Sequence, residues 1–167
     1  MPHPPPMPKK QGGIPPRAAS LILFVDVRVK KIFRLGRNFP WPKPERCPVC
    51  GGSLWGHGFC LAIFDGFPRA LWIRRYRCGH CQRVFRLRPQ GYWSRFQAPI
   101  ATIRAALARR LQRGRWRPDL ARSRQGHWLR ALVRQVLAYL GQGWRGRWLE
   151  GFDLLWRKGK VPVCRSI

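Results

Sequence analysis

Two Cys-x-x-Cys pairs constrain the fold of this chain more than any other feature of its sequence. The first pair is Cys47-Pro-Val-Cys50, the second is Cys78-Gly-His-Cys81, and 27 residues lie between them. Each pair places two thiolates on one tight turn, and two such turns can complete a tetrahedral four-thiolate zinc site. We therefore expect one structural zinc ion held by Cys47, Cys50, Cys78 and Cys81.

The residues around the pairs favour tight turns. Pro48 restricts φ after the first cysteine, and Gly51 and Gly52 let the chain reverse so that amides point at the sulfurs. The gap exceeds the roughly 15 to 20 residues of the commonest pattern, but two strands and a hairpin turn would fill it. The alternative is a disulfide-bonded extracellular domain; the cysteine spacing and the lack of a secretory signal pattern argue against it.

Charge is the second constraint. The chain carries 34 Lys and Arg against 6 Asp and Glu, a formal net charge of +28. Such a chain repels itself, so we expect a polyanionic partner, namely nucleic acid and in particular double-stranded DNA. No apolar run reaches the roughly 20 residues that cross a bilayer. We expect no membrane association and no small-molecule substrate, and a cytoplasmic, nucleoid-associated location.

The N-terminal third divides into two segments. Residues 1–19 are rich in proline, which predicts a disordered tail. Residues 20–46 should form a strand and then a stiff Pro-rich linker over residues 38–46. The strand is expected across residues 20–33, because a β-prone run at residues 21–25 is followed by the alternation Val25, Val27, Val29.

Residues 47–89 are predicted to form a small three-stranded antiparallel zinc ribbon. Its strands should cover residues 53–63, 69–77 and 84–87, with a turn at Asp65-Gly66. A ribbon of about 40 residues buries too little apolar surface to fold alone, so we expect it to depend on its metal.

Residues 98–141 are predicted to form a three-helix bundle with a helix-turn-helix. The first helix should run from Ile100 to Gly114, a short second one from Pro118 to Arg122, and a third from Arg124 to Leu140, capped by Ser123 and ended by Gly141. The fold class is therefore α+β. The Trp/Arg-rich segment 142–167 has aromatic residues at helical spacing, which favours a core role over base stacking.

The third predicted helix has two distinct faces. At about 100° per residue, Trp128, Leu132 and Val136 lie on an apolar face. Arg124, His127, Arg130 and Arg134 lie on the other, as a helix entering the major groove requires. A surface helix in an Arg-rich protein is the simpler alternative. In the ribbon, the candidate phosphate contacts are Arg74, Arg75, Arg77 and Arg83.

The ribbon resembles a known group of sequences. It is similar to the N-terminal zinc ribbon of bacterial insertion-sequence transposases, and more closely to uncharacterised transposon-associated zinc-ribbon proteins with a following helix-turn-helix. The similarity covers roughly residues 46–140. It is carried by Cys47-Pro-Val-Cys50-Gly-Gly, Gly56-His57-Gly58 and Arg74-Arg-Tyr-Arg-Cys78-Gly-His-Cys81-Gln-Arg-Val-Phe85.

The resemblance implies DNA binding at or near mobile elements, with the four cysteines as the metal ligands. Full transposases of this kind continue into a catalytic domain that bears three metal-binding carboxylates. After the ribbon, this chain has about 85 residues and only Asp119, Glu150 and Asp153 as acidic residues. We therefore expect a protein that binds DNA without cutting it and is not an enzyme.

Two other functional hypotheses remain open. The chain could be an RNA-binding or ribosome-associated structural protein, or the remnant of a transposase gene. The other cysteines suggest no further site: Cys60 should be a buried small apolar residue and Cys164 a free thiol. No nucleophile-base pattern, carboxylate pair or phosphate-binding loop is present in the sequence.

Overall fold

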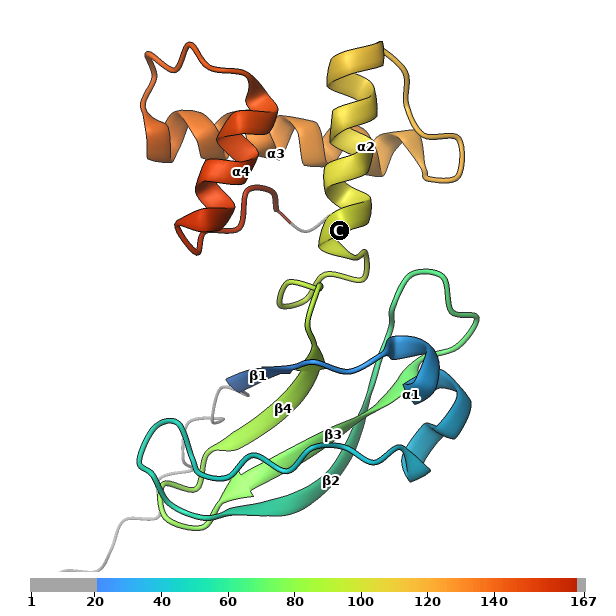
Figure 1. Ribbon diagram of the computed structural model, residues 1–167, viewed down its shortest axis with the longest axis vertical. Helices are drawn as coiled ribbons and strands as arrows, with labels where there is room; N and C mark the ends of the chain where they lie inside the picture. Colours follow the sequence, from blue (N-terminus) through green and yellow to red (C-terminus); the bar gives the residue numbers. More distant parts are fainter. Residues whose placement is uncertain (1–20, 165–167) are drawn as a thin grey trace, which may run out of the picture.

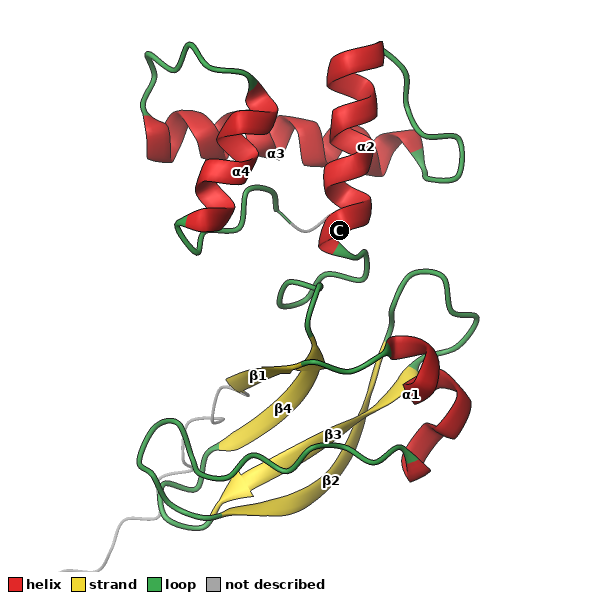
Figure 2. Ribbon diagram, in the orientation of Figure 1, coloured by secondary structure: helices red, strands yellow, loops and turns green. Residues whose placement is uncertain are grey.

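The computed structural model describes residues 21–164, which form a sheet part and a helical part (Figures 1 and 2). The predicted Pro-rich tail, residues 1–19, lies outside these residues. The sheet part contains β1 (Leu21–Val25), α1 (Val29–Leu35), the 3-10 helix η1 (Gly36–Asn38), β2 (Leu54–Ala62), β3 (Leu71–Cys78) and β4 (Val84–Pro89). The helical part contains α2 (Ile100–Arg113), α3 (Arg122–Leu140) and α4 (Trp148–Arg157).

The sheet has four strands in the order β1-β4-β3-β2. Strands β2, β3 and β4 pair in antiparallel fashion, as the ribbon prediction requires, and β1 pairs with β4 in parallel. The predicted count of three strands is therefore wrong. The reason is burial: Leu21, Leu23 and Val25 pack against a cluster that includes Phe85 and Leu87, which strands β2 to β4 alone would leave uncovered.

The segment after β1 is a helix instead of the predicted continuation of the strand. The alternation of Val25, Val27 and Val29 is too short to outweigh tertiary packing. From Val29 onward the apolar residues Val29, Ile32 and Phe33 recur at helical spacing, and Ile32 is fully buried. Gly36 ends α1 with a φ of 55°, a conformation that favours glycine.

Two small apolar clusters hold the sheet part together. One contains Ile32, Phe39, Phe64, Leu71, Ile73 and Tyr92. The other contains Cys47, Leu54, Tyr76, Cys78, Phe85 and Leu87. Trp41 contacts both clusters, so the Pro-rich segment 39–47, drawn across the sheet in Figure 1, covers the Tyr76 and Phe85 side of it. This segment is therefore packed against the sheet.

The helical part has one larger core. It joins all three helices to the connecting residues Trp93 and Phe96, and at its centre Trp128, Leu132 and Phe152 are almost fully buried. The core role that the sequence favours for the C-terminal aromatics is confirmed for Phe152, whereas Trp156 remains about half exposed. None of the helices within residues 21–164 is long and apolar enough to cross a membrane.

The predicted helix at Pro118–Arg122 does not form. Residues 114–121 form a loop, and the side chain of Gln125 hydrogen-bonds to backbone groups of this loop. The buried amide of Gln125 accepts from the Arg117 N–H and donates to the carbonyls of Arg117 and Leu120. Asp119 forms an ion pair with Arg117 instead of capping a helix. The short middle helix of the expected helix-turn-helix is therefore missing, and α4 is the third helix of the bundle.

The two long predicted helices are confirmed, and only the start of α3 is shifted. Helix α2 begins at Ile100 and ends at Gly114, whose φ of 65° is left-handed, as the sequence predicts. Helix α3 begins at Arg122 after Ala121, so Ser123 lies inside the helix and does not cap it. Gly141 ends α3 as predicted.

Polar contacts join the sheet part to α3 and to the residues that lead into α2. Asp65, in the β2–β3 turn, pairs with Arg124 on α3, with 2.7 Å between Oδ2 and Nη1. The Asp65 N–H donates to the Gln97 carbonyl over 3.0 Å. The buried guanidinium of Arg88 donates to the Phe96 carbonyl and lies over the rings of Phe64 and Tyr92.

Candidate metal centre and basic surfaces

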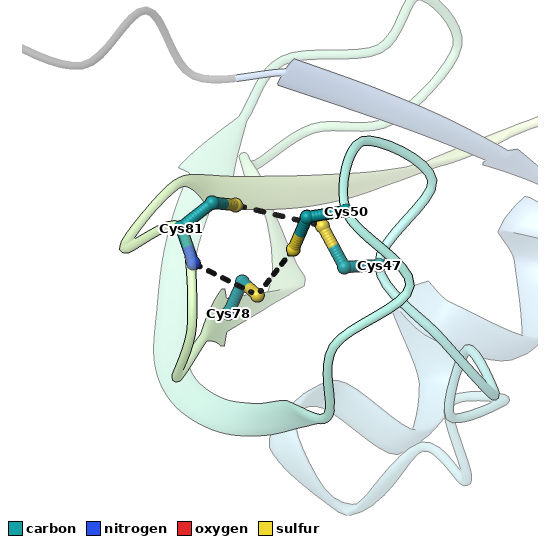
Figure 3. Close-up of side chains that lie close together, drawn as sticks. All are labelled: Cys47, Cys50, Cys78 and Cys81. Atoms are coloured by element: carbon teal, nitrogen blue, oxygen red, sulfur yellow. Dashed lines mark hydrogen bonds between the residues drawn. The ribbon is translucent and has the colours of Figure 1, made fainter.

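The four predicted ligands come together at one end of the sheet (Figure 3). Their sulfur atoms all lie within 4.8 Å of one another. The Cys47–Cys81 pair is 3.6 Å apart and the Cys50–Cys78 pair 3.5 Å apart. A regular tetrahedron with Zn–S bonds of about 2.3 Å has edges of about 3.8 Å. The spacing therefore fits one metal ion with four thiolate ligands, which is consistent with zinc.

Backbone hydrogen bonds shape the two turns that present these thiols. In the first turn, the Cys47 N–H donates to the Gly52 carbonyl and the Gly51 N–H donates to the Cys47 carbonyl, each over 2.8 Å. In the second, the Cys78 N–H donates to the Arg83 carbonyl over 2.9 Å. Gly51 has a φ of 71°, which explains the glycine at the point where the chain reverses.

The surroundings of Gly52 show how closely the two cysteine turns approach each other. A Cβ at this position would lie 2.9 Å from the Cβ of His80 and 3.2 Å from the sulfur of Cys78. Only glycine leaves the two turns close enough for their sulfurs to share one ion. Cys47 and Cys78 are buried and Cys50 is exposed, an arrangement that suits a closed structural site at the edge of a domain.

The local electrostatics favour thiolate formation at one position first. The Cys81 N–H donates to the sulfur of Cys78 over 3.5 Å and is the main reason that the pKa of the Cys78 thiol falls to about 6, against the opposing effect of burial. The Arg83 amide lowers the pKa of Cys81, but burial and the neighbouring sulfurs outweigh it and raise that pKa to about 11. A divalent cation would let all four thiols ionise together.

The remaining cysteines lie elsewhere. Cys60 is half-buried on β2 and packs against the cluster that contains Ile73, so it behaves as the small apolar residue that was predicted. Cys164 is a free thiol, as predicted; its sulfur lies 3.2 Å from His127 Nε2 and 3.6 Å from Arg134 Nη2.

The predicted ribbon arginines do not share one surface. Arg74 stacks on the ring of Phe59, 4.8 Å from its centroid, and its guanidinium lies against Gly56. Arg75 and Arg77 alternate with the buried Tyr76, so they lie on the opposite side of β3 from it. Arg83 is exposed in the turn between Cys81 and β4.

The predicted basic face of α3 is partly occupied by the protein itself. Arg124 pairs with Asp65 and stacks on Trp128, 4.9 Å from the ring centroid. His127 and Arg134 contact the sulfur of Cys164. Arg130 is exposed. The apolar face is confirmed, since Trp128, Leu132 and Val136 are all buried.

Sequence reasoning missed Arg86, which lies directly opposite Arg75 across β3 and β4. The signal was present in the alternation of β4: Phe85 and Leu87 are buried, which directs Val84 and Arg86 to the opposite side. The pairing with Arg75 depends on the strand register, which the sequence does not specify.

Comparison with protein-family models, curated proteins and solved structures finds no match to this chain.

Proposed function

We propose that this protein binds DNA through its phosphates and does not cut it, with one structural zinc ion holding the ribbon. The observation that carries this proposal is that few of the basic side chains form ion pairs in the folded protein. Within residues 21–164, the ion pairs are Arg104–Asp153, Arg117–Asp119, Arg124–Asp65 and Arg147–Glu150. Most of the 34 basic side chains therefore have no acidic partner. A polyanion is the partner that would neutralise them.

The zinc ion has a structural role in this proposal. Four thiolates fill a tetrahedral shell and leave no open position for water or substrate. Four of the six acidic residues, Asp65, Asp119, Glu150 and Asp153, are each engaged by an arginine, which leaves few free carboxylates to hold catalytic metal ions. Association with mobile elements is part of the proposal and rests on the resemblance of the ribbon alone.

Fluorescence anisotropy with labelled DNA tests this function. If about six to eight phosphates are contacted, log affinity should fall against log salt with a slope of about −5 to −7. RNA of the same sequence serves as the competitor. A flat salt response would exclude nucleic acid as the partner, and tighter binding to RNA at every salt concentration would favour the RNA-binding alternative.

A further inference from the structure

One side of the sheet in the ribbon is basic, and among residues 21–164 part of it is exposed. Its other part is covered, because Leu71, Ile73 and Arg88 alternate onto the same side and are buried. Tyr76 and Phe85 are buried under the segment that contains Trp41, whereas Arg75 and Arg86 point to the other side. Figure 1 shows α2, α3 and α4 beyond the end of β4, so these helices do not cover either side of the sheet. We define the open face as the exposed part of this side, which consists of Arg75, Arg86, Arg77, Phe24 and Trp55.

Strand register places the aromatic residues of this face beside the arginines. Trp55 on β2 pairs with Arg77 on β3, and cross-strand partners share a side of the sheet. Ile22 on β1 pairs with Arg86 on β4, and Phe24 follows it by two residues, on the same side. Trp55 is 64% exposed and Phe24 47% exposed. Surfaces that bind a single nucleic-acid strand combine exposed aromatic rings, which stack on bases, with basic side chains, which contact phosphates. Both kinds of side chain are present on this face.

Within residues 21–164, the arginines of the open face have no acidic partner. None of the ion pairs among residues 21–164 includes Arg75, Arg77 or Arg86. The Nε atoms of Arg75 and Arg86 are shielded from solvent and make no hydrogen bond to the described residues. Like charges directly opposite each other destabilise a sheet. An anion placed over the Arg75–Arg86 pair would relieve this repulsion.

We infer that the open face binds an unpaired DNA strand, with phosphates over Arg75, Arg77 and Arg86 and bases stacked on Phe24 and Trp55. This inference rests on the proposed function and names the surface and the form of DNA. A duplex keeps its bases stacked inside, so it cannot use exposed rings on a sheet. A second copy of this chain is a poor occupant, because it would bring arginines against arginines. On α3, by contrast, Arg124 and Arg134 already have contacts within the protein.

Binding of zinc-loaded, full-length protein to labelled single-stranded DNA tests the inference against a duplex of the same sequence. At about 0.2 M salt, where the phosphate contribution is weakened, the single strand should bind about tenfold more tightly. Phe24→Ala should weaken single-strand binding about 5- to 100-fold, because one stacked base is lost. Trp156→Ala is the matched control, since Trp156 has the same exposed fraction of 47% on α4; it should have no effect.

Three further variants separate phosphate contacts from folding. Arg86→Ala should reduce the salt slope for single strands by about 0.7, whereas Arg130→Ala on α3 should leave it unchanged. Phe24→Leu keeps the apolar contact without the aromatic ring; it should lose affinity while retaining zinc and circular dichroism. Tighter duplex binding that depends on Arg130 would overturn the inference about the open face but keep the proposed function. If the wild-type protein bound no DNA, both would be overturned.

Discussion

The sheet part and the helical part carry the same net charge but differ in how many of their basic side chains form ion pairs. Residues 21–97 and residues 98–164 each contain fifteen Lys or Arg and three Asp or Glu. All four ion pairs among residues 21–164 nevertheless use an arginine of the helical part, and Asp65 of the sheet part pairs with Arg124 on α3. Among these residues, the basic side chains of the sheet part are thus left without acidic partners. Equal composition does not imply equal availability for a ligand.

The two parts also differ in what stabilises them. The helical part has a single cluster of fourteen buried residues, whereas the sheet part divides its core into two clusters of six. Two of the six residues in one sheet cluster are the candidate metal ligands Cys47 and Cys78. Buried apolar area is the main source of stability for a domain this small. We therefore expect the helical part to fold on its core and the sheet part to depend on its metal.

Removal of zinc should give the largest difference between the parts. Structural zinc contributes on the order of 10 kcal/mol to folding, so a chelator should unfold β2, β3 and β4 while α2, α3 and α4 persist. Hydrogen exchange resolved by peptide would measure this. Cys78→Ser should act like the chelator, and Cys60→Ser should leave the zinc content unchanged. Full protection of the strands in metal-free protein would show that the sheet has enough core of its own.

Truncation of the helical core should have the opposite pattern. Phe152 is fully buried against Trp93, so Phe152→Ala should lower the free energy of unfolding by about 3 to 5 kcal/mol. Denaturant unfolding followed by helical circular dichroism measures this, and the zinc content should not change. Trp156→Ala on the same helix should cost far less, since Trp156 is about half exposed. Equal losses in the two variants would contradict a single core centred on Phe152.

The smallest expected effect concerns the link between the parts. The Asp65–Arg124 pair has side-chain exposures of 23% and 24%, so solvent screens it only in part. A double-mutant cycle with Asp65→Asn and Arg124→Gln should give a coupling energy of about 0.5 to 1 kcal/mol. It should be measured on the helical unfolding transition with zinc bound. A coupling of zero would mean that the two parts are stabilised independently.

Local patterns in the sequence were sufficient where one interaction type dominated. The four cysteines predict the metal site because two Cys-x-x-Cys turns together supply the four thiolates of a tetrahedral site. Helix α2 and the end of α3 follow from apolar spacing and from Gly114 and Gly141. In each of these cases the determining contacts lie within a few residues along the chain, so propensity and spacing are enough.

Predictions failed where distant residues compete for the same segment. The stretch after Val25 has a strand-like alternation, but burial of Ile32 under the sheet selects a helix. The loop at residues 114–121 has helix-starting residues, but the amide of Gln125 holds its backbone groups in another arrangement. Neither competing contact can be seen from local sequence, because each depends on which elements pack together.

The sequence by itself determined the candidate metal ligands, the antiparallel strands between them, the apolar face of α3 and the excess of positive charge. Only the tertiary structure decided which arginines remain unpartnered and where they lie. The parallel pairing of β1 with β4 and the register that sets Arg75 opposite Arg86 both come from strand packing. A sequence specifies charges and periodicities, but their mutual distances depend on long-range contacts, which only the folded chain defines.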